Sequence, residues 1–137
     1  MALIPDISAI LAQAFDDEDA AYAESVIEAI AADEAIVPTL FWLEIRNSLL
    51  LGERRGRLTP ERTGAFLSDL ALLPFVVDES PREAAVFDLA RRHTLSIYAA
   101  VYLELAQRKN LPLATLDHAL IKAAKCSAIT IFPRAGK

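Results

Sequence analysis

The chain has 137 residues, a hydrophobic fraction of 54%, one cysteine and a formal net charge of -5. This length and composition predict one globular domain, residues 1–137, and exclude an intrinsically disordered chain. The negative net charge excludes a strongly basic, generic nucleic-acid binder, because such proteins neutralise phosphates over a wide surface. Any contact with a nucleic acid is therefore expected to be local.

The sequence also carries features that predict its cellular environment. No apolar run approaches the roughly 18 residues that a membrane-spanning helix needs, and the N-terminus lacks the basic region of a signal peptide. The single cysteine, Cys126, has no internal disulfide partner, and we expect it to be a small buried side chain late in a helix. These features predict a soluble, cytoplasmic protein without a membrane partner.

Short apolar segments alternate with longer segments of helical periodicity along the chain. Strands are expected at 1–5, 35–37, 75–77, 113–115 and 128–132, and helices at 7–15, 19–32, 40–51, 59–73, 80–92, from the N-cap Ser96 onward, and at 118–125. The helix at 80–92 is expected to open with a capping box that begins at Ser80. This order predicts an α/β fold with a mostly parallel sheet of about five strands and helices on both faces.

Three acids follow the predicted strands. Asp6 comes directly after the first strand, Glu44 lies one turn into the helix after the second, and Asp117 follows the fourth. Right-handed crossovers bring the carboxyl ends of parallel strands to one edge, where ligands bind in α/β sheets. Three carboxylates there suit Mg²⁺ or Mn²⁺ and metal-assisted hydrolysis of phosphodiesters.

Glu44 has more than one interpretation at this point. Its neighbours in the sequence are Phe41, Trp42, Leu43 and Ile45, so its carboxylate is paired, bound to a metal, or turned outward. Pairing with Arg46 is the structural alternative, and Arg46 is otherwise a candidate RNA contact.

Four segments carry the sequence motifs that surround these acids. They read DIS from Asp6, VPTLFWLEIRN around Glu44, LSIYAAVYLELA around Ala99, and PLATLD ending at Asp117. Their order and spacing resemble the PIN-domain ribonucleases, most closely the VapC-type toxins of bacterial toxin–antitoxin pairs. The resemblance spans nearly the whole chain and implies a PIN-like three-layer α/β/α fold.

The resemblance also implies an activity and roles for individual residues. The activity is a metal-dependent endoribonuclease toxin, in which water activated by Mg²⁺ (or Mn²⁺) cleaves RNA. The implied metal ligands or supporting acids are Asp6, Glu44 and Asp117. Ser8 and Thr115 would orient those acids, and Asn47 would support Glu44 from one turn away.

The resemblance implies partners as well. They are a cognate VapB-type antitoxin whose peptide covers the cleft, an RNA substrate that we expect to be tRNA or rRNA, and a second copy in a homodimer. DNA would be contacted only through the antitoxin.

Two residues depart from the family pattern. Pro5 stands where the family usually has an aliphatic residue, and because proline has no N–H to donate, it is expected to mark where strand pairing stops. Ala99 stands where the family has its third aspartate. The loss of one central acid predicts weaker metal binding and an inactive or severely impaired nuclease, whether the alanine is natural or introduced.

Two other function classes remain to be weighed. A non-catalytic PIN-like module would hold an antitoxin or RNA in the same cleft without cutting it. A phospho-acceptor, receiver-like domain also uses acids at strand ends, but Asp16 and Asp17 lie too far past Asp6 to form its acidic pair.

The remaining polar and aromatic residues are assigned structural roles. Trp42 and Phe41 are expected in the core or at a dimer contact, and Tyr98 and Tyr102 are expected to pack. The acids at 16–19 are expected to be a solvated helix cap. Helix-end positions, where cations favour the dipole and stay solvated, are expected for three groups of basic residues: Arg54, Arg55 and Arg57, then Arg91 and Arg92, then Arg108 and Lys109. Helix-end or surface roles are expected for His93 and His118.

Overall fold

The computed structural model describes residues 1–17 and 19–133. The elements in chain order are β1 (Ile4–Pro5), α1 (Ser8–Phe15), α2 (Ala20–Ala32), β2 (Ala35–Pro38), α3 (Phe41–Arg54), α4 (Pro60–Leu70), β3 (Phe75–Asp78), α5 (Glu83–His93), α6 (Ile97–Lys109), β4 (Leu113–Ala114) and α7 (His118–Cys126). No helix within the described residues is long and apolar enough to cross a bilayer.

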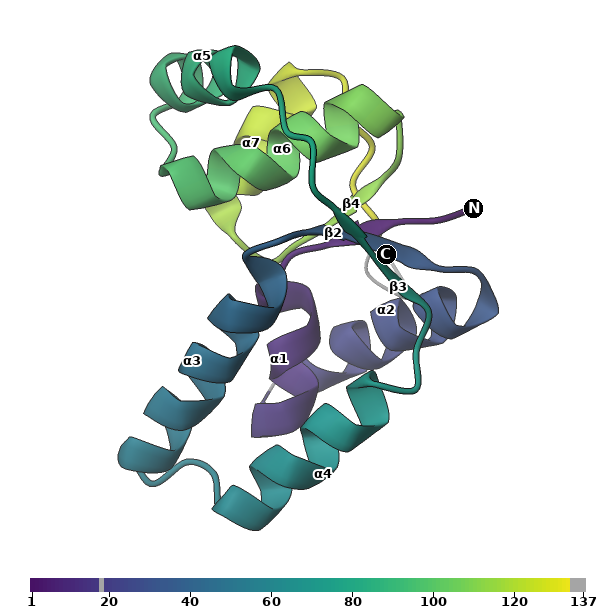
Figure 1. Cartoon of the computed structure of the whole chain (residues 1–137), viewed down its shortest axis with the longest axis vertical. Coiled ribbons are helices and arrows are strands. Elements are labelled where there is room, and N and C mark those ends of the chain that lie inside the picture. The colour runs from purple at the N-terminus through teal and green to yellow at the C-terminus, as the bar shows by residue number, and fades with distance from the viewer. Residues whose placement is uncertain (18, 134–137) are drawn as a thin grey trace.

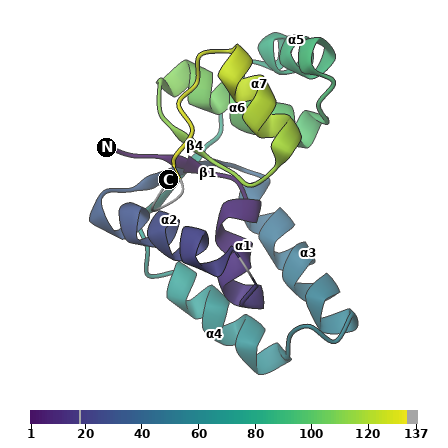
Figure 2. The same ribbon diagram turned by 180° about the vertical axis from the view of Figure 1, so that it is seen from behind.

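The strands form one parallel arrangement built from two short ladders. β1 pairs with β4 and β2 pairs with β3, and a single bridge between Leu3 and Ala35 joins the two pairs. Helices α1 to α4 lie on one side of the strands and α5 to α7 on the other (Figures 1 and 2). The predicted three-layer α/β/α fold with a parallel sheet is therefore confirmed.

The predicted fifth strand is reduced to a single bridge. Ile131 bridges Leu113, whose N–H donates to the carbonyl of Thr130 at 2.9 Å while its carbonyl accepts from Phe132 N–H at 2.9 Å. Residues 128–132 therefore lie beside β4 but do not continue as a strand.

Two prolines keep the ladder between β1 and β2 short. Leu3 N–H donates to Glu34 O at 3.2 Å, and Ile36 N–H donates to Leu3 O at 3.0 Å. The next rung of a parallel ladder would need the N–H groups of Pro5 and Pro38, which neither residue has. Pairing on the other side of β1 continues, because Asp6 N–H donates to Ala114 O at 3.0 Å. Pro5 thus stops strand pairing, as predicted, but only toward β2.

The core lies where the strands meet both helical layers. Ile4, Leu113 and Ala114 are fully buried, as expected for short parallel strands covered on both faces. β3 is the exception at the sheet edge, where Val76 and Val77 are 46% and 40% exposed. Phe41 is fully buried in the core and Trp42 packs on it edge to face, which confirms their expected core position.

Several local predictions differ from the structure. Helix α5 begins at Glu83 with Arg82 at its N-cap, so the capping box predicted from Ser80 is wrong. The helix after Thr59 does begin as predicted, because the Thr59 side chain accepts from Arg62 N–H and a proline occupies the first position. Cys126 is exposed rather than buried. In the acidic run, Asp16 and Asp17 are exposed as expected, and residue 18 lies outside the described residues.

Arg108 is the clearest correction to the predicted solvated helix ends. Its side chain is only 17% exposed and pairs with Asp78 on β3 at 2.6 Å and with Glu104 on its own helix at 2.7 Å. Its hydrogen bonds to Asp78 hold the pKa of that carboxyl below its usual range. Glu104 itself is 2% exposed, so this guanidinium neutralises a buried acid and ties α6 to the edge strand.

We predict that Arg108→Ala lowers the free energy of unfolding by about 3 kcal/mol, because it leaves the two acids buried without their cation. Urea denaturation near neutral pH measures the change. The matched control is Arg92→Ala, which breaks an exposed pair with Asp88 and should cost no more than about 0.5 kcal/mol. Equal losses for the two variants would contradict the buried role of Arg108.

Candidate active site

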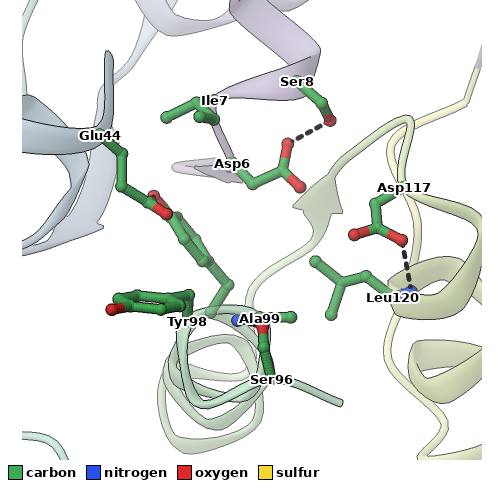
Figure 3. A pocket seen from close by; sticks show the side chains of 10 residues that line it. Asp6, Ile7, Ser8, Glu44, Ser96, Tyr98, Ala99, Asp117 and Leu120 are labelled. Atoms are coloured by element: carbon green, nitrogen blue, oxygen red, sulfur yellow. Dashed lines mark hydrogen bonds between the residues drawn. The ribbon is translucent and has the colours of Figure 1, made fainter. Parts of the chain in front are cut away.

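A pocket of about 310 Å³ opens at the carboxyl ends of β1 and β4. The N-terminal parts of α1, α3, α6 and α7 surround it (Figure 3). Its lining residues are Asp6, Ile7, Ser8, Glu44, Ser96, Tyr98, Ala99, Tyr102, Asp117 and Leu120. The three predicted acids and Ala99 therefore meet in one pocket, although they come from four separate parts of the chain.

Asp6 is the most buried acid of the pocket, at 7% exposure. Its Oδ1 accepts hydrogen bonds from Ser8 Oγ at 2.5 Å and from Ala9 N–H at 3.2 Å, and its Oδ2 accepts one from Thr115 Oγ1 at 2.5 Å. Burial raises the pKa of Asp6, the three hydrogen bonds oppose that rise, and the nearby charge of Asp117 adds to it. Both carboxylate oxygens are thus held in a fixed orientation.

The two hydroxyl groups also connect the ends of β1 and β4. Ser8 Oγ accepts from Leu116 N–H at 2.9 Å, and Thr115 Oγ1 accepts from Asp117 N–H at 3.0 Å. Each hydroxyl therefore donates to Asp6 and accepts from the backbone that leads to Asp117. This geometry is consistent with the orienting role that the sequence suggested for Ser8 and Thr115.

Glu44 lies in the first turn of α3 and is half-buried. Its Oε1 accepts a hydrogen bond from the Tyr102 hydroxyl at 3.0 Å. Burial raises the pKa of Glu44, the Tyr102 bond lowers it, and the charge of Asp6 raises it further. The carboxylate thus points toward the other acids and has a neutral partner.

Arg46 and Asn47 do not take part in this pocket. The Arg46 guanidinium lies 5.9 Å from the centre of the Trp42 ring and lines a different pocket, so the alternative pairing of Glu44 with Arg46 is wrong. Asn47 is exposed and is not among the residues that line the acidic pocket. Of the polar residues near Glu44 in sequence, neither supports it in this structure.

Asp117 lines the pocket and also caps a helix. It is the N-cap of α7, and its Oδ1 accepts from Ala119 N–H at 2.9 Å and from Leu120 N–H at 3.3 Å. Because this residue is exposed at the mouth of the pocket, its carboxylate is accessible to an incoming ligand.

Ala99 faces the three acids from the first turn of α6 (Figure 3). Its N–H donates to Ser96 Oγ at 3.1 Å, which confirms Ser96 as the N-cap of this helix. A longer side chain at 99 would project into the pocket, because the methyl group of Ala99 already lines it. An aspartate at this position would therefore add a fourth carboxylate to the pocket.

Sequence reasoning assigned both tyrosines of α6 to packing and missed their place in the pocket. Tyr98 is 63% exposed at the rim, so the expected packing role is wrong for it. Tyr102 is 3% exposed and does pack, but its hydroxyl also orients Glu44. The sequence did carry a sign that both tyrosines lie near Ala99, because positions 98, 99 and 102 fall on one face of a helix.

The acids of the pocket are of the chemical kind that binds a hard metal ion such as Mg²⁺. Within the described residues, no three Asp, Glu, His or Cys side chains are arranged so that they could hold a metal ion. Mg²⁺ nevertheless keeps several waters and is often bound by only one or two carboxylates together with substrate phosphates. The pocket, with its three carboxylates and neither lysine nor arginine in its lining, fits such a weakly held ion.

Comparisons with known proteins agree with this geometry. Residues 3–125 match the PIN domain family. Ribonuclease VapC3 of Pyrobaculum aerophilum is 32% identical over 125 residues, which are 88% of this chain and 92% of that protein. This match excludes the receiver-like alternative.

Solved structures show the same fold. The crystal structure of PAE2754 from Pyrobaculum aerophilum has a TM-score of 0.65 and 26% identity, and the alignment covers 90% of this chain and 87% of that one. FitAcB from Neisseria gonorrhoeae has a TM-score of 0.66 at 15% identity over 97% of both chains, a likeness of fold alone. The chain belongs to the PIN-domain family, and its similarity within that family is to the VapC-type ribonucleases.

Proposed function

We propose that this chain is a metal-dependent endoribonuclease toxin of a toxin–antitoxin pair whose active site is impaired by Ala99. The observation that carries the proposal is the meeting of Asp6, Glu44 and Asp117 in one pocket, with Ala99 on its remaining side. The relation to a VapC ribonuclease supports RNA as the substrate, and tRNA or rRNA are the RNAs we expect.

The residues of the pocket have distinct tasks in this proposal. Asp6, Glu44 and Asp117 would hold Mg²⁺ (or Mn²⁺), which when bound polarises a phosphate and activates water. Ser8 and Thr115 keep Asp6 oriented because they donate to both of its oxygens, and these hydrogen bonds oppose the rise in its pKa that burial causes. Tyr102 holds Glu44 toward the pocket in the same way. The pocket is thus pre-organised on three sides for a cation.

Ala99 provides no metal ligand on the remaining side of the pocket. A carboxylate on the first turn of α6 would add one negative ligand, and the positive end of the helix dipole would favour it there. With alanine at 99, a bound ion would lack that ligand, and the attacking water would lack one carboxylate that positions it. We therefore expect this chain to bind the metal weakly and to cleave RNA slowly or not at all.

Protein partners are part of the same proposal. We expect a VapB-type antitoxin, a homodimer, and contact with DNA only through the antitoxin. A second pocket of about 360 Å³ supports a protein partner, because it is lined by apolar side chains that include Trp42, Leu67 and Phe75. Leu72 and Leu43, at 85% and 71% exposure, add apolar surface of the kind that protein partners cover.

The competing candidate is a PIN-like module that binds RNA or an antitoxin without cutting. The alanine at 99 and the incomplete acid set are the observations that favour it. The two candidates differ in what restoring the acid should do.

We predict that Ala99→Asp produces RNA cleavage with Mg²⁺ or Mn²⁺ at least about 100-fold above the parent chain, because it completes the acid set. Cleavage of a tRNA and rRNA mixture, read on a gel, measures the gain. Ala99→Asn is the matched control, similar in shape but uncharged, and should stay near the parent. If Ala99→Asp neither cuts any RNA nor arrests growth when expressed alone, the nuclease proposal fails and the binding module is favoured.

We also predict that Mg²⁺ stabilises the Ala99→Asp variant more than the parent chain. At a free concentration about ten times the dissociation constant, binding adds about 1.4 kcal/mol, which raises Tm by roughly 3–6 °C for a domain of this size. Differential scanning fluorimetry with and without Mg²⁺ measures the shift. Adding Asp6→Asn to the Ala99→Asp variant should remove it, and an unchanged shift in that double variant would place the ion elsewhere.

A further inference from the structure

A third pocket, which we call the basic pocket, lies between the end of α5 and one face of α7. It has a volume of about 400 Å³ and is lined by Arg92, His93, Thr94, Ala119, Lys122, Ala123 and Cys126. No carboxylate is among these lining residues, whereas the acidic pocket has three carboxylates and no lysine or arginine. The two pockets therefore have opposite charge.

We propose that the basic pocket binds a backbone phosphate of the RNA strand whose neighbouring phosphate enters the acidic pocket, and that Lys122 is the main positioning residue. This inference rests on the proposed ribonuclease function, since it names how that substrate is held.

The need for such a site follows from charge. The chain has a net charge of -5, and the acidic pocket repels phosphates until a cation is bound. Phosphate contacts by Lys and Arg supply most of the sequence-independent affinity for nucleic acids. A protein of this charge therefore needs local cations beside the acids if it is to hold RNA.

The two pockets are lined by neighbouring residues of the same two segments. Thr94 lines the basic pocket and Ser96 the acidic one, with only Leu95 between them. On α7, Ala119 faces the basic pocket and the next residue, Leu120, faces the acidic pocket. Lys122 is five positions after Asp117, a rise of about 7.5 Å along the helix. A single RNA strand that crosses the start of α7 would meet both pockets.

The cations of the basic pocket are available for a ligand. Within the part of the chain that the structure describes, Lys122 is exposed and forms no salt bridge. Arg92 pairs with Asp88 at 2.7 Å, but both side chains are about 60% exposed, at 63% and 60%, and such pairs are weak. The His93 Nε2 atom lies 3.4 Å from Ser127 Oγ.

Several other arginines have partners outside the acidic pocket. Arg108 is held by two acids, and Arg62 donates to the carbonyls of Gln13 and Ala14. Arg57 and Arg46 lie over the rings of Phe15 and Trp42. Arg54 is the last residue of α3, at the opposite end of that helix from Glu44, which lines the acidic pocket. The basic pocket is thus a cationic surface that lies next to the acidic pocket on α7.

The test uses the parent chain, because Ala99 allows binding to be measured without cleavage. The probe is a short, fluorescently labelled single-stranded RNA of mixed sequence at about 0.1 M salt. Lys122→Gln should raise Kd about fivefold and lower the slope of log K against log salt by about 0.7, the values for one lost phosphate contact on a single strand. Lys122→Arg should retain most of the affinity.

The matched control is Lys125→Gln, which removes the same charge from an exposed position of α7 that does not line the basic pocket. It should change Kd less than twofold. Equal losses for Lys122→Gln and Lys125→Gln, or no measurable RNA binding by the parent chain, would overturn the proposal. Unchanged melting temperatures show that each variant is folded.

A cleavage assay separates this proposal from the nuclease itself. In the Ala99→Asp background, Lys122→Gln should raise KM about fivefold and leave kcat unchanged. If Ala99→Asp cleaves RNA but Lys122→Gln behaves like Lys125→Gln, only the basic pocket is refuted. If Ala99→Asp never cleaves while Lys122→Gln still weakens RNA binding, the nuclease proposal fails and the phosphate site stands.

Discussion

The site depends on one interaction, the hydrogen bonding of the buried Asp6 carboxylate by Ser8 and Thr115. A carboxylate at 7% exposure would be costly without partners, and here two hydroxyls at 2.5 Å and one backbone N–H satisfy it. The same hydroxyls accept from the backbone after β4, so the acid is oriented and the two strand ends are joined. Removing either hydroxyl would disturb both the site and the local fold.

The prolines explain why this edge of the sheet is open. Because Pro5 and Pro38 cannot donate, β1 and β2 separate directly after Leu3 and Ile36, while β1 and β4 remain paired as far as Asp6. The chain leaving β2 can then turn into α3, and Glu44 approaches Asp6 from the side that the ladder has vacated. The ladder between β1 and β2 thus ends just before the residues that line the acidic pocket.

Charge is separated over a short distance on the surface around α7. The acidic pocket lies at its N-terminus and the basic pocket along its next turns, and the two have in common a helix and the loop before α6. An enzyme that attracts a polyanion to a cluster of acids has to solve this electrostatic problem. In the proposed function, Ala99 leaves the first pocket one acid short, and residue 99 does not line the second pocket.

The sequence by itself determined the α/β class, the parallel strands and the three acids, because periodicity and strand-end positions are local features of the chain. The place of Ala99 among those acids followed from the resemblance to the PIN-domain family. It did not determine the partners of those acids: Tyr102 rather than Arg46 contacts Glu44, and Arg108 is buried against Asp78 and Glu104. It also placed Cys126 inside, predicted a full last strand, and left the basic pocket unnoticed. Only the tertiary structure decided these points, since each depends on which helix faces cross one another and on how much surface a neighbouring element covers.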